Sequence, residues 1–378
     1  MNQSQSEIKE VNSAQEESYM QRCLNLASLG LGKVSPNPMV GALVVFQGKI
    51  IGEGWHKKFG KAHAEVNAIG EALDYLNLNF PDQETLTNKQ FLNTILYVSL
   101  EPCSHFGKTP PCVDLILFHK IPKVFVACLD PNPIVSGNGI EKLRTNKVEV
   151  VLGTLEKEAK FLNRRFFTFQ KKKRPYIILK WAETENQTIA PCNPEPYWIS
   201  GELSQRLNHR WRTEEDAILI GKNTALLDQP LLTSRYWNGK NPSKWVLDWN
   251  LEIPVTNSLF HLDSPLYIVN GIKDVSQLQE TQKNIHYIFI ENREYLISFM
   301  LYQMYLRDIC SVVIEGGGET IQGFIDKNLW DEARIIRSKK LFKDGIPSPE
   351  LPANSEPSSQ SNLGPDMILT FLNKKLSF

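Results

Sequence analysis

The chain lacks the features that would place it in a membrane, outside the cell or on nucleic acid. No apolar run approaches the ~18 residues that a membrane-spanning helix needs. Residues 1–18 are polar, so the N-terminus has no apolar secretory segment. Lys and Arg number 42 against 42 Asp and Glu, so net charge gives no argument for an anionic partner. We therefore expect a cytoplasmic protein with no nucleic-acid and no membrane partner.

Cysteine is also scarce, with six in 378 residues. In a reducing compartment, clustered cysteines are more often metal ligands than disulfide partners. The remaining composition, 42% hydrophobic and 22% charged, is that of an ordinary globular protein. A chain of this length exceeds one compact core, so we expect two domains.

The first part of the chain alternates helical and strand patterns. Met20, Cys23, Leu24 and Ala27 have helical spacing, and residues 1–17 before them are expected to be a disordered tail. A second helix is expected at 64–73. Strands are expected at 40–46, 49–54, 94–99, 123–128 and 148–151. This alternation predicts an α/β sheet covered on both faces.

A basic run, Lys171–Arg174, precedes Pro175 and the second part of the chain. We interpret it as a solvated linker rather than a phosphate or nucleic-acid patch, which places the domains at 1–172 and 173–378. Strands are expected at 176–181, 217–221, 245–248, 266–269 and 310–315, a helix at 291–306 and a loop at 347–362. The chain has no internal repeat, so the two domains are expected to differ.

A His-Ala-Glu triplet and two later cysteines predict a zinc site. His63 precedes a helical segment, and Cys103 and Cys112 follow a strand-like run. One imidazole and two thiolates suit tetrahedral zinc and leave the fourth position for water, as in catalytic sites. Glu65 can reach that water without binding the metal, and so can move its proton. The pattern is typical of zinc nucleobase deaminases.

Other interpretations of these residues remain open at this point. Two buried cysteines can be simple small hydrophobes. A structural zinc would need a fourth protein ligand, for which His105 is a candidate. Otherwise His56 and His105 are expected at the surface or behind the ligands.

The eight residues between Cys103 and Cys112 distinguish this segment from most cytidine and tRNA-adenosine deaminases, which have two. The chain here resembles the bifunctional deaminase–reductases of riboflavin biosynthesis. The shared segments are Pro36-Asn37-Pro38 with Val40-Gly41, His63-Ala64-Glu65, the Glu101–Cys112 block and Asp130–Gly139. The resemblance implies a cytidine-deaminase-like three-layer α/β/α domain. In it His63, Cys103 and Cys112 hold Zn2+, Glu65 is catalytic, and Asn37 and the 130–139 loop line the substrate pocket.

A second candidate site follows the strand-like run Cys310–Glu315, which leads into Gly316-Gly317-Gly318 and a helix start. Such a turn lets backbone amides approach a phosphate at the helix N-terminus, although a plain tight turn explains it equally well. The run is not the Gly-x-Gly-x-x-Gly fingerprint and lies late in the chain, so a standard Rossmann fold is disfavoured.

The order of further segments resembles the reductase half of the same family, which is similar in fold to dihydrofolate reductase and uses NADPH. These segments are Lys180-Trp181-Ala182, Trp198-Ile199-Ser200, Ile218–Gly221 and Asp228–Arg235. The resemblance implies that the coenzyme contacts Ala182, Trp198, Thr224, Asp228, Gly317, Gly318 and Gly323. It implies that the substrate contacts Arg212, Leu232, Arg235 and Glu315.

Three segments depart from the family pattern. Gln187 stands where a turn glycine is usual, and this is costly if the position needs a positive φ. Gln229 replaces a common Asp or Asn, and Lys339–Lys343 replaces Pro-Lys-Leu-Leu-Gly. We expect these changes to weaken coenzyme affinity or reductase rate without altering the fold.

The sequence therefore predicts a bifunctional enzyme acting on a small phosphoribosyl-aminopyrimidine. Zinc-dependent deamination of the ring would precede NADPH-dependent reduction of the ribosyl side chain to ribityl. The resemblance is compatible with a homo-oligomer. One alternative is an active deaminase whose reductase-like domain is weak or only binds substrate. A tRNA deaminase is disfavoured by the neutral net charge and the long cysteine gap, and a purely structural zinc is the non-enzymatic alternative.

Overall fold

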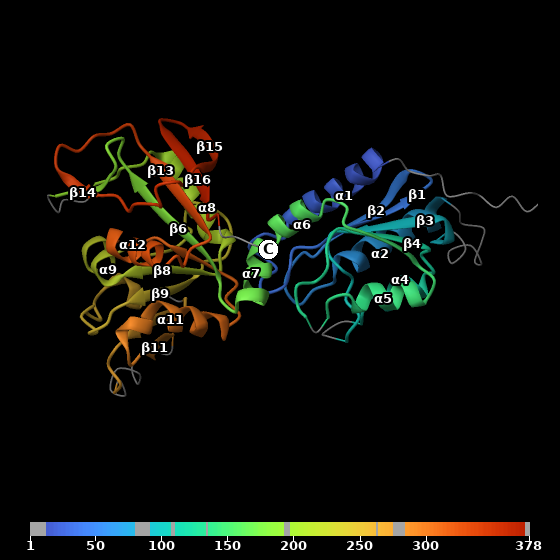
Figure 1. Cartoon of the computed structure of the whole chain (residues 1–378), viewed down its shortest axis with the longest axis horizontal. Coiled ribbons are helices and arrows are strands. Elements are labelled where there is room, and N and C mark those ends of the chain that lie inside the picture. Colours follow the sequence, from blue (N-terminus) through green and yellow to red (C-terminus); the bar gives the residue numbers. More distant parts are fainter. Residues whose placement is uncertain are drawn as a thin grey trace, which may run out of the picture. The chain divides into compact units, whose positions relative to one another are not determined.

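The computed structural model describes residues 13–79, 91–106, 110–133, 135–192, 197–261, 264–274 and 284–374. The chain forms two compact units, Met1–Lys171 and Lys172–Ser377. The first unit runs from blue to green and the second from green to red in Figure 1. Within the described ranges, no helix is both long and apolar enough to cross a membrane.

The N-terminal unit is built on a sheet with strand order β2-β1-β3-β4-β5 among its described residues. The strands are β1 (Gly41–Phe46), β2 (Lys49–Trp55), β3 (Thr94–Val98), β4 (Lys123–Val126) and β5 (Glu149–Leu152). Strand β1 pairs antiparallel with β2 and β3, whereas β3, β4 and β5 are parallel. The loops that follow β3 and β4 therefore start at the same edge of the sheet.

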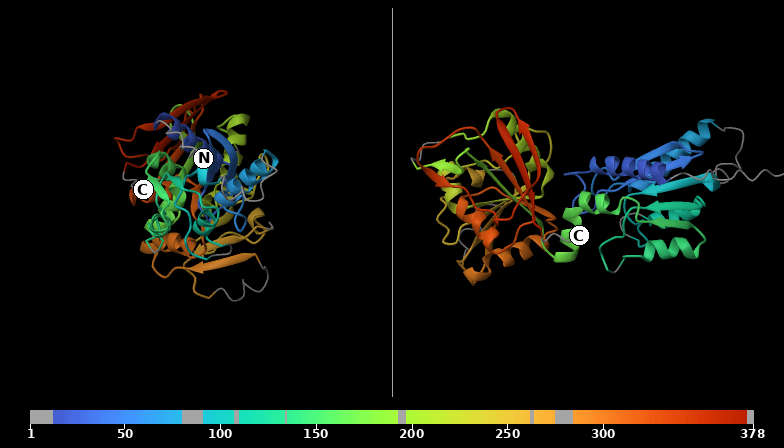
Figure 2. Two further views of the ribbon diagram at one scale, coloured as in Figure 1. Left: turned by 90° about the vertical axis from the view of Figure 1, so that its right-hand side faces the viewer. Right: turned by 45° about the horizontal axis from the view of Figure 1, so that its top comes forward.

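Helices cover both faces of this sheet, as Figures 1 and 2 show. The apolar residues of β1 alternate between them. Leu43 and Val45 pack in a core with residues of α1 (Ser13–Ser28), α6 (Glu156–Leu162) and α7 (Arg164–Lys172). Ala42 and Val44 pack in a core with residues of α2 (Ala64–Asn79), α4 (Cys112–Phe118) and α5 (Asn138–Thr145). The predicted three-layer α/β/α arrangement is confirmed.

Helix α2 lies unusually close to β2 because two strand residues have no side chain. A Cβ atom on Gly52 would lie 2.1 Å from the Ala68 carbonyl oxygen, and one on Gly54 would lie 2.2 Å from that of Ala64. Any larger residue would push the helix from the sheet. These glycines thus set the distance between the sheet and the first turn of α2. This turn contains Glu65 and comes directly after His63.

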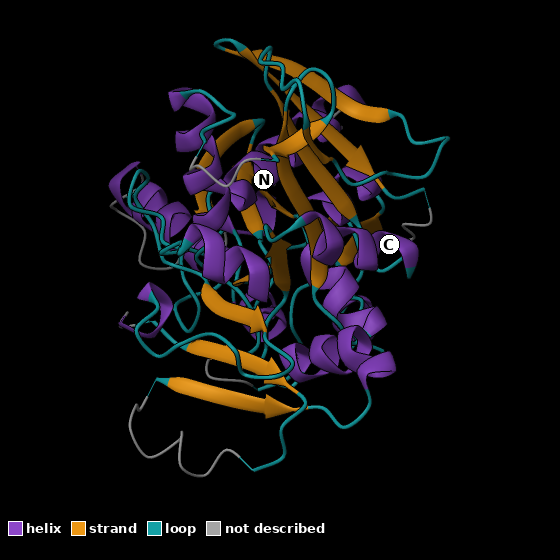
Figure 3. Cartoon of the chain, turned by 90° about the vertical axis from the view of Figure 1, so that its left-hand side faces the viewer, coloured by secondary structure: helices purple, strands orange, loops and turns teal. Residues whose placement is uncertain are grey.

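The C-terminal unit contains a larger sheet, orange in Figure 3. Its order among the described residues is β11-β10-β9-β8-β12-β6-β13-β16-β15, and β14 and β7 form a separate pair. Strands β11 to β13 in this order are parallel, and β16 and β15 are antiparallel. The bounds are β6 (Tyr176–Glu183), β7 (Thr188–Pro191), β8 (Ala217–Gly221), β9 (Ser243–Leu247), β10 (Leu266–Asn270), β11 (Ile285–Phe289), β12 (Ser311–Ile314), β13 (Glu332–Arg337), β14 (Gly345–Pro347), β15 (Pro357–Leu363) and β16 (Asp366–Leu372).

One face of this sheet packs against α11 (Leu296–Tyr305) and α12 (Gly318–Asp326), with Ile177 and Leu179 of β6 in the shared core. Because side chains alternate along a strand, Lys180 points to the opposite face. That face receives Arg212 of α8 (Glu202–Glu214). The remaining elements are α9 (Lys222–Asp228), η1 (Phe91–Asn93), η2 (Ser258–His261) and η3 (Arg293–Tyr295). The predicted α/β class is confirmed for this unit.

Two expectations about irregular segments are wrong in part. Residues 13–17 belong to α1 rather than to a disordered tail, and residues 1–12 lie outside the described ranges. The predicted loop 347–362 contains most of β15. The strand was missed because its residues are polar: among the described strands β15 pairs with β16 alone, and it is exposed along most of its length. Pro357 is tolerated there because an edge strand has backbone N–H groups without partners.

The helix expected at 291–306 begins later, and the basic run is not a fully solvated linker. Asn292 accepts a hydrogen bond from the Glu294 amide at 2.8 Å and caps a short 3-10 turn, after which α11 starts at Leu296. Arg174 Nη2 donates to the buried Asp331 carboxylate at 2.8 Å. Arg174 is therefore an anchor of the C-terminal unit.

Candidate active sites

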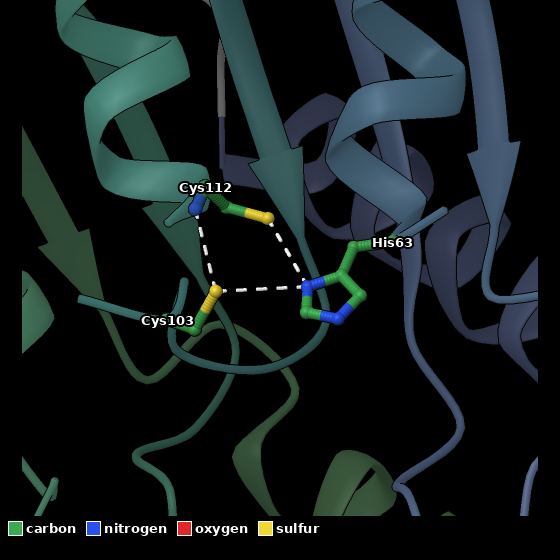
Figure 4. Close-up of side chains that lie close together, drawn as sticks. All are labelled: His63, Cys103 and Cys112. Atoms are coloured by element: carbon green, nitrogen blue, oxygen red, sulfur yellow. Dashed lines mark hydrogen bonds between the residues drawn. The ribbon is translucent and has the colours of Figure 1, made fainter. Parts of the chain in front are cut away.

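Three predicted zinc ligands meet at one edge of the N-terminal sheet (Figure 4). His63 precedes α2, Cys103 lies in the loop after β3, and Cys112 is the first residue of α4. Their ligand atoms all lie within 4.8 Å of one another. Residues separated widely in sequence are thus brought together by the parallel order of the strands.

The spacing of these donors fits zinc. His63 Nδ1 lies 3.6 Å from Cys103 Sγ and 3.3 Å from Cys112 Sγ. Tetrahedral zinc with Zn–S bonds of ~2.3 Å and Zn–N bonds of ~2.0 Å would separate such atoms by about 3.5 Å. Among the described residues no fourth His, Cys, Asp or Glu joins the group, and His105 is exposed. The donor set therefore leaves a coordination position for water or substrate.

One of the two thiols, that of Cys103, favours the thiolate form, whereas its hydrogen bond with Cys112 raises the pKa of Cys112. The Cys112 thiol is the main cause that lowers the pKa of Cys103 to about 4, and His63 adds to it while burial opposes it. The backbone N–H of Cys112 also donates to Cys103 Sγ at 3.3 Å. Since metal ligation requires thiolate, a stabilised thiolate favours metal uptake at neutral pH.

Glu65 lies beside these ligands in the first turn of α2 and is 3% exposed. Burial raises the pKa of Glu65 to about 7, and the charge of Cys103 adds to the rise. A carboxyl group with this pKa can both accept and release a proton near neutral pH.

Asn37 is held by a buried histidine. His56 Nδ1 lies 3.1 Å from the Ala62 carbonyl oxygen, so Nδ1 donates and Nε2 is the acceptor in this tautomer. The Asn37 amide donates to that Nε2 at 3.2 Å. Burial lowers the pKa of His56, which favours the neutral ring. His56 thus lies behind Asn37 and leaves the metal-ligand set to His63 and the cysteines.

In the C-terminal unit, two residues predicted to contact substrate bind each other. Arg212 Nε and Nη2 donate to the Glu315 carboxylate at 2.9 and 2.7 Å, and Nη1 donates to the Thr233 carbonyl at 2.9 Å. Lys180 Nζ lies 3.4 Å from the same carboxylate. Although burial opposes ionisation, Arg212 and Lys180 hold the pKa of Glu315 well below its usual range. Lys180 belongs to the Lys180-Trp181-Ala182 segment but was not among the predicted site residues.

The glycine turn connects β12 to α12 and contacts α9. The Gly317 amide donates to Thr224 Oγ1 at 2.8 Å, which leaves the Thr224 hydroxyl proton free to donate elsewhere. A Cβ on Gly316 would lie 2.5 Å from backbone atoms of Ile220 and Gly221. Thr224, Gly317 and Gly318 therefore form one compact surface at the carboxyl ends of β8 and β12.

The other predicted reductase-site residues differ in how deeply they are buried. Ala182 is half-buried near the end of β6, Leu232 is buried, and Arg235 is exposed with its guanidinium over the Tyr236 ring. Burial raises the pKa of Asp228, the last residue of α9.

Two further predicted coenzyme-binding residues, Trp198 and Gly323, have contacts with other segments of this unit. Trp198 is 64% exposed, and its carbonyl oxygen accepts a hydrogen bond from Lys340 Nζ. Gly323 lies within α12 rather than in the turn, and a Cβ there would approach Ile297 of α11. At 3.8 Å this would be an ordinary contact, so packing does not require a glycine at this position.

Two of the departures from the family pattern contact each other. The Asn186 amide donates to the Phe342 carbonyl at 2.8 Å, and the Glu185 amide donates to the Lys340 carbonyl at 3.0 Å. The changed turn and the changed C-terminal segment are therefore complementary. Gln187 has a φ of 57° and Gln229 a φ of 41°, so both replace residues in the left-handed region.

Comparison with known proteins matches both units. The family model of the cytidine and deoxycytidylate deaminase zinc-binding region matches residues 13–128, and that of the RibD C-terminal domain matches 175–342. The fold and the two matches define a zinc-type deaminase joined to a reductase. The riboflavin biosynthesis protein RibD of Aquifex aeolicus is 35% identical over 365 residues, which cover 94% of this chain and 98% of the relative. This chain belongs to the RibD family.

Further relatives agree. RibD of Bacillus amyloliquefaciens is 33% identical over 373 residues, 95% of this chain and 96% of the relative. The crystal structure of a diaminohydroxyphosphoribosylaminopyrimidine deaminase/5-amino-6-(5-phosphoribosylamino)uracil reductase from Thermotoga maritima superposes with a TM-score of 0.83 at 33% identity. The superposition covers 95% of this chain and 99% of the chain in that structure. The chain is a bifunctional deaminase–reductase of riboflavin biosynthesis, as predicted, and its domains imply zinc and a nicotinamide coenzyme.

Proposed function

We propose that the N-terminal unit deaminates a diamino(phosphoribosylamino)pyrimidinone at zinc held by His63, Cys103 and Cys112. The C-terminal unit then reduces the ribosyl side chain of the uracil product to ribityl with NADPH. The observation that most supports the proposal is the meeting of three zinc-type donors with a buried Glu65 whose pKa is about 7.

His63, Cys103 and Cys112 would hold the zinc, which when bound would lower the pKa of a water molecule that attacks the amino-bearing ring carbon. Glu65 accepts one proton of this water at its carboxylate oxygen and passes it to the ring nitrogen. It then passes the remaining hydroxyl proton to the amino group, which leaves as ammonia while the ring carbonyl forms. Asn37, oriented by His56, offers its remaining amide groups to the substrate. The open coordination position and the buried acid are thus assigned to one reaction.

In the reductase unit, the nicotinamide ring supplies the hydride and the protein positions it. Lys180 of β6 and Arg212 of α8 form ion pairs with Glu315, which follows β12. These three residues form a charged cluster. Since Arg212 already donates three hydrogen bonds within the protein, we assign contact with the substrate phosphate to the exposed Arg235. Ala182, Trp198 and Leu232 remain candidates to enclose the reacting groups.

The preference for NADPH is assigned to Trp249 and Arg293. Strands β8, β9 and β10 are parallel neighbours, so a dinucleotide that starts at Thr224 and Gly317 can extend along their carboxyl ends. Trp249 follows β9, packs on Gly271 after β10, and has the Arg293 guanidinium 5.9 Å from its ring centre. An indole face suits adenine, and a guanidinium suits a ribose phosphate.

The test is a coupled assay on zinc-loaded protein that follows ammonia release and NADPH oxidation in one cuvette. Both signals are expected, and Glu65→Gln should remove both because the reductase then lacks its substrate. Ammonia without NADPH oxidation would instead favour a weak or non-catalytic reductase unit. Absence of both signals in zinc-loaded protein would contradict the proposed substrate.

Coenzyme choice is tested separately by binding. Arg293→Ala should raise the Kd for NADPH by about tenfold or more and leave that for NADH nearly unchanged. The fluorescence of the bound nicotinamide gives both constants without turnover. An equal loss of affinity for the two coenzymes would exclude a role of Arg293 in phosphate recognition.

A further inference from the structure

One buried carboxylate joins two loops of the deaminase unit. Glu101 follows β3, two residues before Cys103, and is 7% exposed. Its Oε1 accepts a hydrogen bond from the Gly139 amide at 2.9 Å, and its Oε2 accepts from Gly137 at 3.0 Å and Asp130 at 3.1 Å. Hydrogen bonds to an ionised carboxylate are stronger than those between neutral groups. A single side chain therefore fixes three backbone positions of the 130–139 loop.

The packing of the loop against Glu101 is equally close. A Cβ on Gly139 would lie 2.3 Å from the Pro102 carbonyl oxygen and 3.2 Å from Glu101 Oε1. The Glu101 amide also donates to the Cys128 carbonyl at the end of β4, at 2.9 Å. Only Pro102, whose φ is restricted by its ring, separates this anchor from the zinc ligand Cys103. The loop cannot shift relative to Cys103 without loss of these contacts.

The anchored loop borders the metal site. Gly139 packs directly against Pro102, the residue before Cys103, so the end of the loop lies next to the segment that carries a candidate zinc ligand. Asp130 Oδ1 in turn accepts from the Asn132 amide at 2.8 Å, so the start of the loop has a defined conformation. The side chains of Asp130, Asn132 and Ser136 in this loop are half-buried.

We propose that Glu101 is a positioning residue for deamination: by holding the 130–139 loop against the Glu101–Cys103 segment, it sets the substrate-binding wall at a fixed distance from the metal. The inference rests on the proposed deaminase function. The Glu101 carboxylate binds backbone amides of this loop, so its effect falls on substrate binding rather than on the chemical step.

The decisive variant is Glu101→Gln, which keeps the shape but replaces one acceptor oxygen with an NH2 group that faces backbone N–H donors. We expect zinc content to remain at the wild-type level by metal analysis. The KM for the aminopyrimidine should rise about tenfold, and kcat should change much less. Hydrogen exchange should accelerate in peptides that cover 130–139 and remain unchanged in α2.

A matched control is available in the other unit. Asp248 is also a buried carboxylate that accepts two backbone hydrogen bonds, from Glu252 and Ile253 at 3.0 and 2.8 Å. Asp248→Asn should leave the deaminase KM unchanged. Gly139→Ala displaces the same loop from its own side, and should reproduce the rise in KM even if Glu101→Gln fails to fold.

Two results would overturn the inference. Unchanged KM and exchange in folded Glu101→Gln and Gly139→Ala would show that the loop position is not limiting. Loss of zinc in parallel with activity would show that Glu101 supports the metal ligands instead. Wild-type ammonia release is measured first, so a failure there counts against the deaminase function rather than against the role of Glu101.

Discussion

At the scale of single residues, the burial of Glu65 bears directly on its proposed role in proton transfer. Its burial raises its pKa to about 7. We expect Glu65→Gln to lower the rate of ammonia release by about 10²–10⁴-fold with zinc content unchanged, because only the proton transfer is lost. The control is Glu71→Gln on the same helix, where the carboxylate is exposed and accepts a hydrogen bond from the Glu53 amide. Normal ammonia release by Glu65→Gln would exclude Glu65 as the proton carrier.

Gln187 gives a prediction about stability. Its φ of 57° lies in the left-handed region, which costs a non-glycine residue roughly 1 kcal/mol. Gln187→Gly should therefore raise the free energy of unfolding by about 0.5–1 kcal/mol, and Gln187→Ala should not. Chemical denaturation of the two variants measures the difference. Equal stability of the two variants would mean that the left-handed conformation carries no strain at this position.

At the scale of elements, the junction of β12 and α12 tolerates no side chain. A methyl group on Gly316 would contact the backbone of Ile220 and Gly221. Gly316→Ala should thus destabilise the protein by about 1–3 kcal/mol and weaken coenzyme binding. The matched control, Gly70→Ala in α2, has open space and should stabilise by about 0.5–1 kcal/mol. Thermal unfolding and coenzyme titration give the two readouts.

The sequence was most informative where one apolar pattern dominates. Strands β1 and β2 lie within a residue of their expected bounds, because buried apolar runs and a Gln47-Gly48 turn leave few alternatives. Strand β13 was not predicted. Its charged residues Glu332 and Arg334 are buried and pair with each other, so the strand does not have the apolar pattern of a buried one.

The candidate sites show the same division. The meeting of His63, Cys103 and Cys112 was predictable because each belongs to a short motif with a chemical reason for its residue types. The pairing of Arg212 with Glu315 and the anchoring role of Glu101 were not, because they depend on which strands become neighbours. Such contacts are set by sheet topology, and no local spacing encodes them.

At the scale of the whole molecule, each unit has its own sheet and its own core. Removal of zinc with a chelator should therefore abolish ammonia release but leave the reduction of added deaminated intermediate intact. NADPH oxidation with that intermediate, before and after chelation, measures this. Loss of both activities would show that the folding of the two units is coupled through the metal.

Acid should weaken the second unit. Burial is the main cause that lowers the pKa of His209 to about 4, and the charges of Arg212 and Arg235 add to it. At this residue the unfolded chain, with a histidine pKa near 6.5, binds more protons than the folded one between pH ~6.5 and ~4. Stability should fall as the pH falls through this window. Denaturant unfolding at pH 7 and pH 5 checks the sign, and His209→Gln should reduce the loss for the second unit.

The contact between α2 and β2 also has a consequence for selection. At Gly52 and Gly54, every single-base change that alters the residue adds atoms where helix carbonyl groups already lie. In a mutant library screened only for folded protein, with no assay of turnover, these two positions should resist change as strongly as core residues. His63 should vary freely in the same screen. Invariance of the two glycines would therefore reflect the close packing of a helix on a sheet. It would not identify catalytic residues.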